Sequence, residues 1–168
     1  MNLRYNSVWR KKRIETQDYE KFMLEALKEA EKAKDIDEVP VGCVIVKDGK
    51  IIAKSHNQKN KKNNSLYHAE IIALHKAMKK LNDWHLLDCC LFVTLEPCPM
   101  CAGAIINARV GTVVFGASDP KAGCFESVFD FCHKFNHTPI VVKGILEKPC
   151  GEILTNYFKT KRKAKNGN

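Results

Sequence analysis

Two short segments constrain the fold of this chain more than any other feature of its sequence. His68-Ala69-Glu70 opens one predicted helix, and Cys98 and Cys101, within Pro97-Cys98-Pro99-Met100-Cys101, open another. One imidazole and two thiolates provide three zinc ligands, and a zinc ion holds such ligands about 2.0–2.3 Å from itself. The fold is therefore expected to bring together the starts of two helices, each at a junction between a strand and a helix.

Three protein ligands are typical of catalytic zinc, which keeps one position for water, whereas structural zinc usually has four. A His-x-Glu segment followed by Pro-Cys-x-x-Cys is the signature of zinc-dependent nucleobase deaminases, in which the glutamate is not a ligand. Zinc lowers the pKa of its bound water to roughly 7. Glu70 would take the proton of that water and pass it to the ring nitrogen and the departing ammonia. Glu70 is thus the candidate catalytic residue, and the candidate metal ligands are His68, Cys98 and Cys101.

Each segment has a simpler explanation when it is taken alone. A His-x-Glu segment occurs by chance, and Glu70 could merely complement the positive end of a helix dipole. A Cys-x-x-Cys pair could be redox-active or consist of two buried thiols. A nucleic acid-binding module with structural zinc would need a fourth ligand, for which His75 is the nearest candidate. The two segments together favour the catalytic site.

Helical and strand patterns alternate along the chain. Helices are predicted at 18–34, 68–81, 97–108, 125–132 and 149–163, and strands at 39–46, 51–55, 90–95, 112–115 and 140–142. An Asp-Gly turn at Asp48-Gly49 joins the first two strands. The pattern predicts one α/β domain over residues 1–168, with a sheet covered by helices on both faces. A basic arm at 1–17 precedes it, and a basic tail at 159–168 follows.

The net charge of +9 indicates a polyanionic partner. Basic residues cluster at Arg10–Arg13, Lys59–Lys62 and Lys159–Lys165, and the last cluster follows Tyr157-Phe158. Aromatic and basic side chains together suit exposed nucleic acid bases, although a solvated tail has the same composition. No apolar run is long enough for a membrane span. Six cysteines outside the metal segment are predicted to be buried thiols in a reducing cytoplasm: Cys43, Cys89, Cys90, Cys124, Cys132 and Cys150.

From about Tyr19 to Arg162 the chain resembles the bacterial TadA-type tRNA-specific adenosine deaminases, a branch of the cytidine deaminase-like superfamily. Beyond the two metal segments, the resemblance rests on Asn57 after the second strand, on Asn136-His137, and on four longer landmarks: Glu38-Val39-Pro40-Val41-Gly42, Val93-Thr94-Leu95-Glu96, Ala102-Gly103-Ala104 and Val114-Phe115-Gly116-Ala117. It implies a three-layer α/β/α sandwich with a five-stranded mixed sheet, one zinc per subunit and a cytoplasmic homodimer. It also implies a substrate, the wobble adenosine of an arginine tRNA anticodon, which is flipped into the pocket and converted to inosine.

The resemblance further implies substrate contacts. The target nucleotide and its base pocket would involve Asn57, Val41, Ala69 and Leu95, and the anticodon and its neighbours would contact Asp119, Lys121, Asn136, His137 and Phe158. Simpler explanations stay open for two of these residues. Asn57 could be an ordinary residue at the end of a strand, and Asp119-Pro120 could be only a turn.

The chain departs from the family pattern after Lys121. Phe125 and Glu126 stand where a glycine-rich loop is expected, and an acidic side chain near a phosphate would be repulsive. The path of this loop or the anticodon specificity could therefore differ. A deaminase of a free nucleobase, nucleoside or pterin-like ring would carry the same zinc site and is the alternative function.

Overall fold

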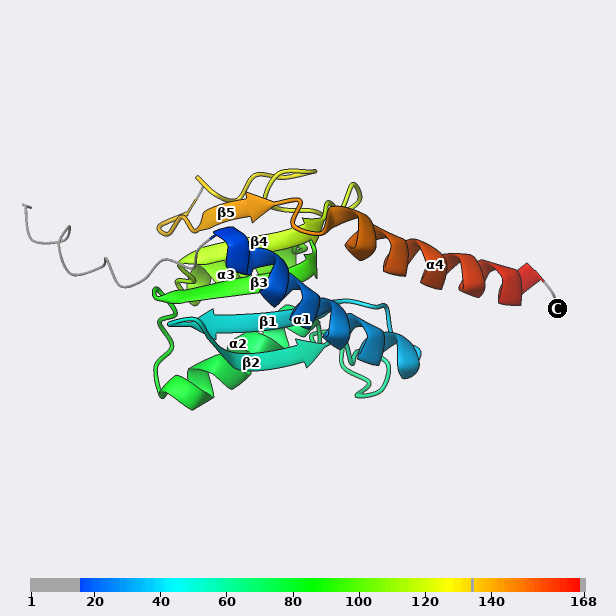
Figure 1. Ribbon diagram of the computed structural model, residues 1–168, viewed down its shortest axis with the longest axis horizontal. Coiled ribbons are helices and arrows are strands. Elements are labelled where there is room, and N and C mark those ends of the chain that lie inside the picture. The colour runs from blue at the N-terminus through cyan, green and yellow to red at the C-terminus, as the bar shows by residue number, and fades with distance from the viewer. Residues whose placement is uncertain (1–15, 134, 167–168) are drawn as a thin grey trace, which may run out of the picture.

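The structure is a computed structural model that describes residues 16–133 and 135–166 (Figure 1). The described chain forms four helices and five strands in the order α1 (Thr16–Asp35), β1 (Gly42–Lys47), β2 (Lys50–His56), α2 (Ala69–Leu81), β3 (Cys89–Leu95), α3 (Pro99–Asn107), β4 (Thr112–Ala117), β5 (Ile140–Lys143) and α4 (Glu147–Asn166). The strands make one sheet in the order β2-β1-β3-β4-β5. β1 pairs antiparallel with β2 and β3, whereas β3, β4 and β5 run parallel. The predicted five-stranded mixed sheet is confirmed.

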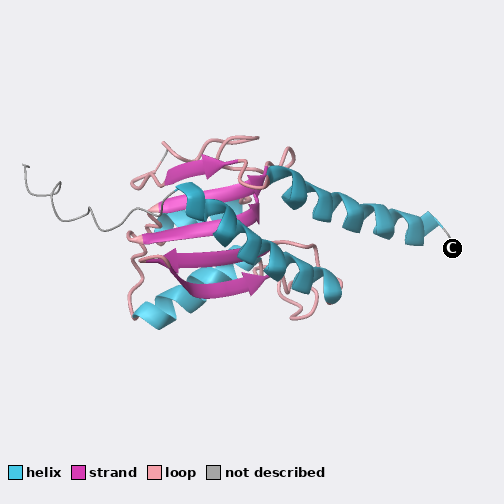
Figure 2. Cartoon of the chain, viewed as in Figure 1, coloured by secondary structure: helices cyan, strands magenta, loops and turns pink. Residues whose placement is uncertain are grey.

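The sheet is the middle layer of a three-layer α/β/α sandwich. The helices α2 and α3 cover one face and α1 covers the other, while α4 begins against β4 and extends beyond the sheet (Figure 2). Side chains of the central strands alternate between the two cores, as the two-residue period of a strand requires. Ile45 and Leu91 belong to the core beneath α2 and α3, whereas Val44 and Phe92 belong to the core beneath α1 and α4. The alternation fixes the register, because a slip of one residue would exchange the two cores.

The structure departs from the predicted elements at two places. The predicted helix over 125–132 is wrong, because residues 124–127 form a turn and residues 128–132 contain no helix. The backbone N–H groups of Phe125, Glu126 and Ser127 all donate to the buried Glu96 carboxylate, which bends this segment around one acceptor. β1 also begins at Gly42, three residues later than predicted. Pro40 has no backbone N–H to give a neighbouring strand.

The structure describes most of the basic tail but little of the basic arm. Residues 1–15 of the basic arm lie outside the described residues, whereas 159–166 of the basic tail continue α4. No described helix is long and apolar enough to cross a membrane. The six cysteines outside the metal segment are buried free thiols, as the sequence predicts.

Candidate active site

The candidate metal ligands meet where α2 and α3 begin. His68 is the N-cap of α2, Cys98 is the N-cap of α3, and Cys101 lies in the first turn of α3. The Nδ1 atom of His68 is 3.7 Å from the Sγ of Cys98 and 3.6 Å from the Sγ of Cys101. The three ligand atoms lie within 4.8 Å of one another. The structure thus brings together residues that the sequence keeps in separate segments.

The distances fit a zinc-sized ion. Ligand bonds of about 2.0–2.3 Å in tetrahedral geometry give ligand-to-ligand distances of about 3.5–3.8 Å, and the two sulfur-to-nitrogen distances are of this size. Within residues 16–133 and 135–166, no fourth His, Cys, Asp or Glu joins the group. His75 is exposed on α2 and does not take part. This arrangement argues against a structural metal with four protein ligands.

Neither helix uses its metal-ligand side chain as a cap. The side chains of His68 and Cys98 make no capping hydrogen bond. The free N–H of Ala69 at the start of α2 donates to Oδ1 of Asn57 (2.9 Å) instead. Pro99 opens α3 and has no N–H that needs a partner. Both ligand atoms are therefore free to face the metal position.

The thiol of Cys98 is electrostatically suited to metal binding. A hydrogen bond from Cys101, opposed by burial and assisted by His68, lowers the pKa of Cys98 to about 4. A thiolate is the form of cysteine that binds metals. The contacts with Cys101 and His68 therefore favour the metal-binding form of Cys98.

Glu70 lies beside the triad in the first turn of α2 and is 4% exposed. Burial raises the pKa of Glu70 to about 7. Among the described residues, its Oε2 is the buried side-chain oxygen that lacks a hydrogen-bond partner. Buried polar groups are nearly always paired, so an unpaired carboxylate oxygen beside three metal-ligand atoms is typical of a reaction centre.

The four expected base-pocket residues lie near the start of α2 or the end of β3. Asn57 bridges two segments, because its Nδ2 donates to the Val39 carbonyl (3.0 Å) and its Oδ1 accepts from Ala69. Val41 and Ala69 are buried in the core beneath α2 and α3. Leu95 is half-buried at the end of β3. Asn57 therefore has a structural role, which leaves one amide hydrogen and one lone pair for a ligand.

A groove of about 530 Å³ joins the end of β3, the loop after β4 and α4. It brings together Leu95, Asp119, Lys121 and Phe158. Leu154 and Arg162 also line the groove, and Leu154 was not predicted from the sequence. Leu154 lies four residues before Phe158 and Arg162 lies four residues after it, and this spacing could have placed all three on one face of a helix.

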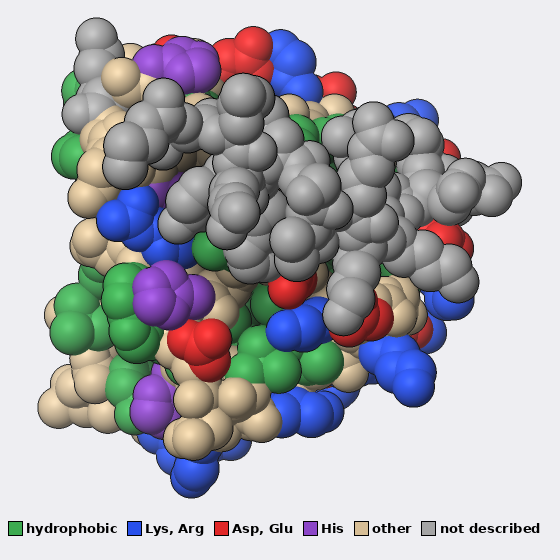
Figure 3. All heavy atoms as spheres, turned by 90° about the vertical axis from the view of Figure 1, so that its left-hand side faces the viewer, with side chains coloured by type: hydrophobic (Ala, Val, Ile, Leu, Met, Phe, Trp, Pro, Cys, Tyr) green, Lys and Arg blue, Asp and Glu red, His purple; other side chains and the backbone are tan. Residues whose placement is uncertain are grey.

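Asn136 and His137 lie at a different place. The backbone carbonyl of Asn136 accepts from Arg109 (2.8 Å), and Nε2 of His137 bonds the Val110 carbonyl (2.7 Å). Both contacts are at the amino-terminal end of β4, about 20 Å from its carboxyl end at 3.3 Å per residue. Figure 3 shows the molecule from this side, where histidine and hydrophobic side chains gather. The structure does not bring these two residues to the triad of the same chain.

The two unusual loop residues point away from the groove. The Phe125 side chain is 4% exposed and belongs to the core beneath α2 and α3. Glu126 forms an ion pair with Lys143 of β5 (2.5 Å). Neither residue lines the groove. Phe125 and Glu126, which depart from the family pattern, therefore contact the core and β5 and not the groove.

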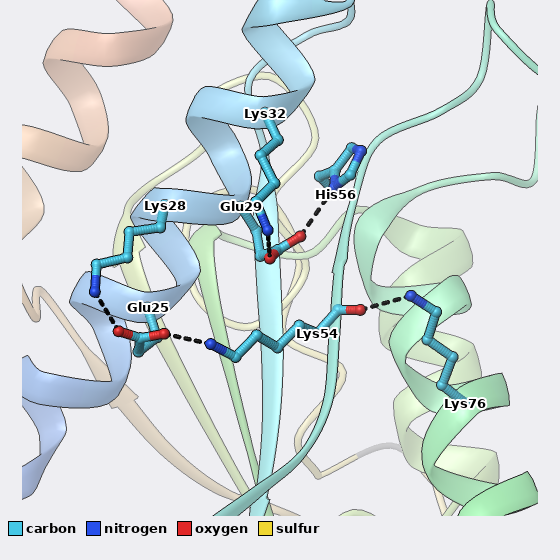
Figure 4. Close-up of polar contacts among 7 residues, drawn as sticks. All are labelled: Glu25, Lys28, Glu29, Lys32, Lys54, His56 and Lys76. Atoms are coloured by element: carbon cyan, nitrogen blue, oxygen red, sulfur yellow. Dashed lines mark hydrogen bonds and ion pairs between the residues drawn. The ribbon is translucent and has the colours of Figure 1, made fainter.

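The strand end that carries Asn57 is held by ionic contacts on α1 (Figure 4). Glu29 of α1 is 4% exposed, accepts from Lys32 (2.6 Å) and contacts Nδ1 of His56 (2.9 Å), which precedes Asn57. Burial raises the pKa of Glu29, but the hydrogen bonds from Lys32 and His56 outweigh it and hold the pKa below its usual value. On the other face, Lys76 of α2 donates to a β2 carbonyl (2.7 Å).

The fold and the His-Cys-Cys triad beside a buried glutamate define the deaminase class, and comparison with known proteins agrees. A family model described as MafB19-like deaminase matches residues 17–162. The tRNA-specific adenosine deaminase of Bacillus subtilis is 48% identical over 152 residues, which are 89% of this chain and 94% of that protein. The chain belongs to the family of tRNA-specific adenosine deaminases, and it is a deaminase.

Solved structures share the same fold. One, from studies of A-to-I editing by tRNA:A34 deaminases at the wobble position of transfer RNA, has a TM-score of 0.77 and 43% identity, and the match covers 80% of this chain and 99% of that one. A guanine deaminase from Nitrosomonas europaea has a TM-score of 0.70 and 25% identity, with 82% and 83% covered. The cytidine deaminase-like fold is therefore shared by enzymes with different substrates.

The triad predicts one metal ion per chain. In zinc-supplemented protein, His68→Ala should lower the bound zinc to about a tenth of the wild-type value or less, because two thiols alone make a poor site. Cys124→Ala is the matched control, since Cys124 is buried but lies outside the triad. Elemental analysis of the purified variants measures the zinc. Equal losses in the two variants would contradict the assignment.

Proposed function

We propose that this protein is a zinc-dependent hydrolase that converts the wobble adenosine of an arginine tRNA anticodon to inosine. The observation that carries the proposal is the unpaired, buried Glu70 beside the His-Cys-Cys triad. A groove with a basic, aromatic helix on one side opens from the neighbouring strand end. The names of the relatives support the wobble adenosine of a tRNA as the substrate.

His68, Cys98 and Cys101 would hold the zinc ion, one per subunit, which supplies hydroxide near neutral pH by lowering the pKa of water to roughly 7. Glu70 is placed to move protons, because it lies next to the ligands without belonging to their group. Its free Oε2 would take a proton from the attacking water and give it to the ring nitrogen, and the carboxyl would then help to protonate the departing ammonia.

The base would be held by Asn57, Val41, Ala69 and Leu95. The remaining amide hydrogen and lone pair of Asn57 would bond the flipped nucleotide, while the two bonds that already hold the amide fix its direction. Val41, Ala69 and Leu95 would supply the apolar walls. A preorganised amide of this kind loses little entropy when the base enters.

The groove would hold the neighbouring nucleotides. Tyr157 donates to the Asp37 carbonyl (3.2 Å) and Lys161 pairs with the Asp37 carboxylate (2.5 Å), so α4 is fastened to the chain segment before β1. Phe158 is 43% exposed and faces the groove together with Arg162. An aromatic ring and a guanidinium suit stacking on an unpaired base and contact with its phosphate. Asp119 and Lys121 would contact the anticodon from the opposite wall.

A homodimer is part of the proposal. Asn136 and His137 lie a strand's length from the triad of their own chain, although they are proposed to contact the anticodon loop. A second subunit offers a way to bring them to the RNA bound by its partner. The cytoplasmic location and the basic arm at 1–17 belong to the same proposal, since a cytoplasmic tRNA is the substrate.

A deaminase of a free purine base is the second candidate, because a guanine deaminase shares this fold. Such an enzyme needs the triad and Glu70 but has no use for a basic helix beside the groove.

Inosine formation separates the two candidates. Zinc-loaded protein should convert adenosine to inosine in an arginine tRNA anticodon stem-loop and leave free adenosine, cytidine and guanine unchanged. Glu70→Ala should keep zinc and stem-loop affinity but lose turnover by about 10²-fold or more, because proton transfer contributes at least that much. Mass spectrometry of digested RNA measures the product. Turnover of a free base with an untouched stem-loop would contradict the tRNA assignment.

The salt dependence of RNA binding tests the role of α4. Replacing both Arg162 and Lys163 by alanine should reduce the slope of log affinity against log salt concentration by about 1.5, because fewer counterions are released. Lys79 and Lys80 are the matched control pair, since they lie at the far end of α2, about 20 Å from the triad at 1.5 Å per residue. Fluorescence anisotropy with a labelled stem-loop measures both slopes. The same slope in both double variants would remove α4 from the interface.

A further inference from the structure

The carboxylate of Glu96 is the centre of a hydrogen-bond network that takes no part in the proposed proton transfers or base contacts. Glu96 follows β3 directly and is 2% exposed. Its Oε2 accepts from the backbone N–H of Asp119 (3.0 Å) and from the hydroxyl of Ser127. Its Oε1 accepts from the backbone N–H groups of Phe125 (3.1 Å), Glu126 (2.8 Å) and Ser127 (3.0 Å). Both ends of the loop 119–127 therefore converge on one buried carboxylate.

The sequence of the loop is adapted to this contact. Gly123 lies against Glu96, and a Cβ at this position would overlap Oε2. The backbone also links the same two segments, because the N–H of Cys124 donates to the Pro97 carbonyl (3.0 Å) and the N–H of Glu96 donates to the Ala117 carbonyl (2.9 Å). The loop is thus seated on the segment 96–97, next to the metal ligand Cys98.

The position of Glu96 connects the two halves of the site. On one side, its segment continues into Cys98 and Cys101. On the other side, the loop that it holds carries Asp119 and Lys121, which form one wall of the groove. The Asp119 carboxylate also accepts from the backbone N–H of Lys121 (2.9 Å), so the wall is a turn whose start is bonded to Glu96. Any movement of this carboxylate moves the wall relative to the metal position.

We propose that Glu96 is a positioning residue that fixes the groove wall at Asp119 and Lys121 relative to the metal triad. The proposal rests on the proposed function, since the groove matters only if it holds nucleotides beside the reacting base. A flipped base reaches the metal correctly only when the neighbouring sugar and phosphate are held at the right distance. A misplacement of about 1 Å can cost roughly 10²-fold in rate.

The test uses Glu96→Gln in the full-length, zinc-loaded protein. The amide keeps the shape of the carboxylate but presents N–H groups where donors already converge, so the loop should loosen. We expect kcat/KM for the stem-loop to fall by roughly 10²-fold, through a higher KM from the loosened groove wall and a lower kcat from the misplaced base. Zinc content should not change. Amide exchange at Phe125, Glu126 and Ser127 should become about tenfold faster or more, because hydrogen bonds to a charged acceptor are lost.

Two further variants separate positioning from lost stability. Gly123→Ala leaves Glu96 in place but pushes the loop away from it, and should give the same rise in KM and in amide exchange. Val46→Ala removes core volume at the far end of the sheet, where Val46 pairs with Cys90, and should lower stability without raising KM.

Three results would overturn the proposal: loop amides as protected in Glu96→Gln as in the wild type, an unchanged KM, or zinc lost in step with activity. The last result would mean that Glu96 serves the metal segment rather than the groove. Failure of the proposed function itself would look different. Wild-type protein would leave the stem-loop unmodified, and the amide exchange of Glu96→Gln and Gly123→Ala would then decide alone whether Glu96 holds the loop.

Discussion

The starts of α2 and α3 meet, and every other part of the site is arranged around this contact. His68 and Cys98 are both N-cap residues, and their side chains point at each other and not at their own helices. Neither side chain is needed as a cap, because Asn57 accepts from the first N–H of α2 and Pro99 has no N–H at the start of α3. The sheet then sets the distance between the two helices, because β2 leads to α2 and β3 leads to α3 across the intervening β1. The metal position is therefore a property of the whole α/β/α sandwich.

The buried carboxylates near the site differ in whether hydrogen bonds satisfy them. Burying a charge is costly unless hydrogen bonds satisfy it. Glu29 is satisfied by Lys32 and His56, and Glu96 by the loop after β4. Glu29 holds the end of β2 before Asn57, and Glu96 holds the loop 119–127. Glu70 differs, because one of its buried oxygens has no partner among the described residues. The carboxylate that is left unsatisfied is the one beside the three residues that could hold a metal, where a reacting proton would need an acceptor.

The sequence predicted most of the fold and the grouping of His68, Cys98 and Cys101, because local patterns encode both. Apolar periodicity marks the strands, and metal ligands at helix starts occur in short motifs. The turn at 124–127 was beyond such reasoning, since its shape is set by Glu96, far away in the sequence. A helical pattern around Phe125 was overridden by burial of that ring and by capture of three backbone N–H groups. The groove was missed for a similar reason, because β3, the loop after β4 and α4 meet only in three dimensions.

His68, Cys98 and Cys101 would leave one metal position open beside Glu70. X-ray absorption spectroscopy at the zinc edge of the purified protein measures this coordination. We expect two sulfur ligands at about 2.3 Å, one histidine nitrogen at about 2.0–2.1 Å and a lighter ligand that exchanges with solvent. In Glu70→Ala the sulfur and histidine ligands should stay unchanged. A shell of four protein ligands, or a carboxylate that disappears in Glu70→Ala, would show that the metal is closed to a reacting water and would rule out this site as the reaction centre.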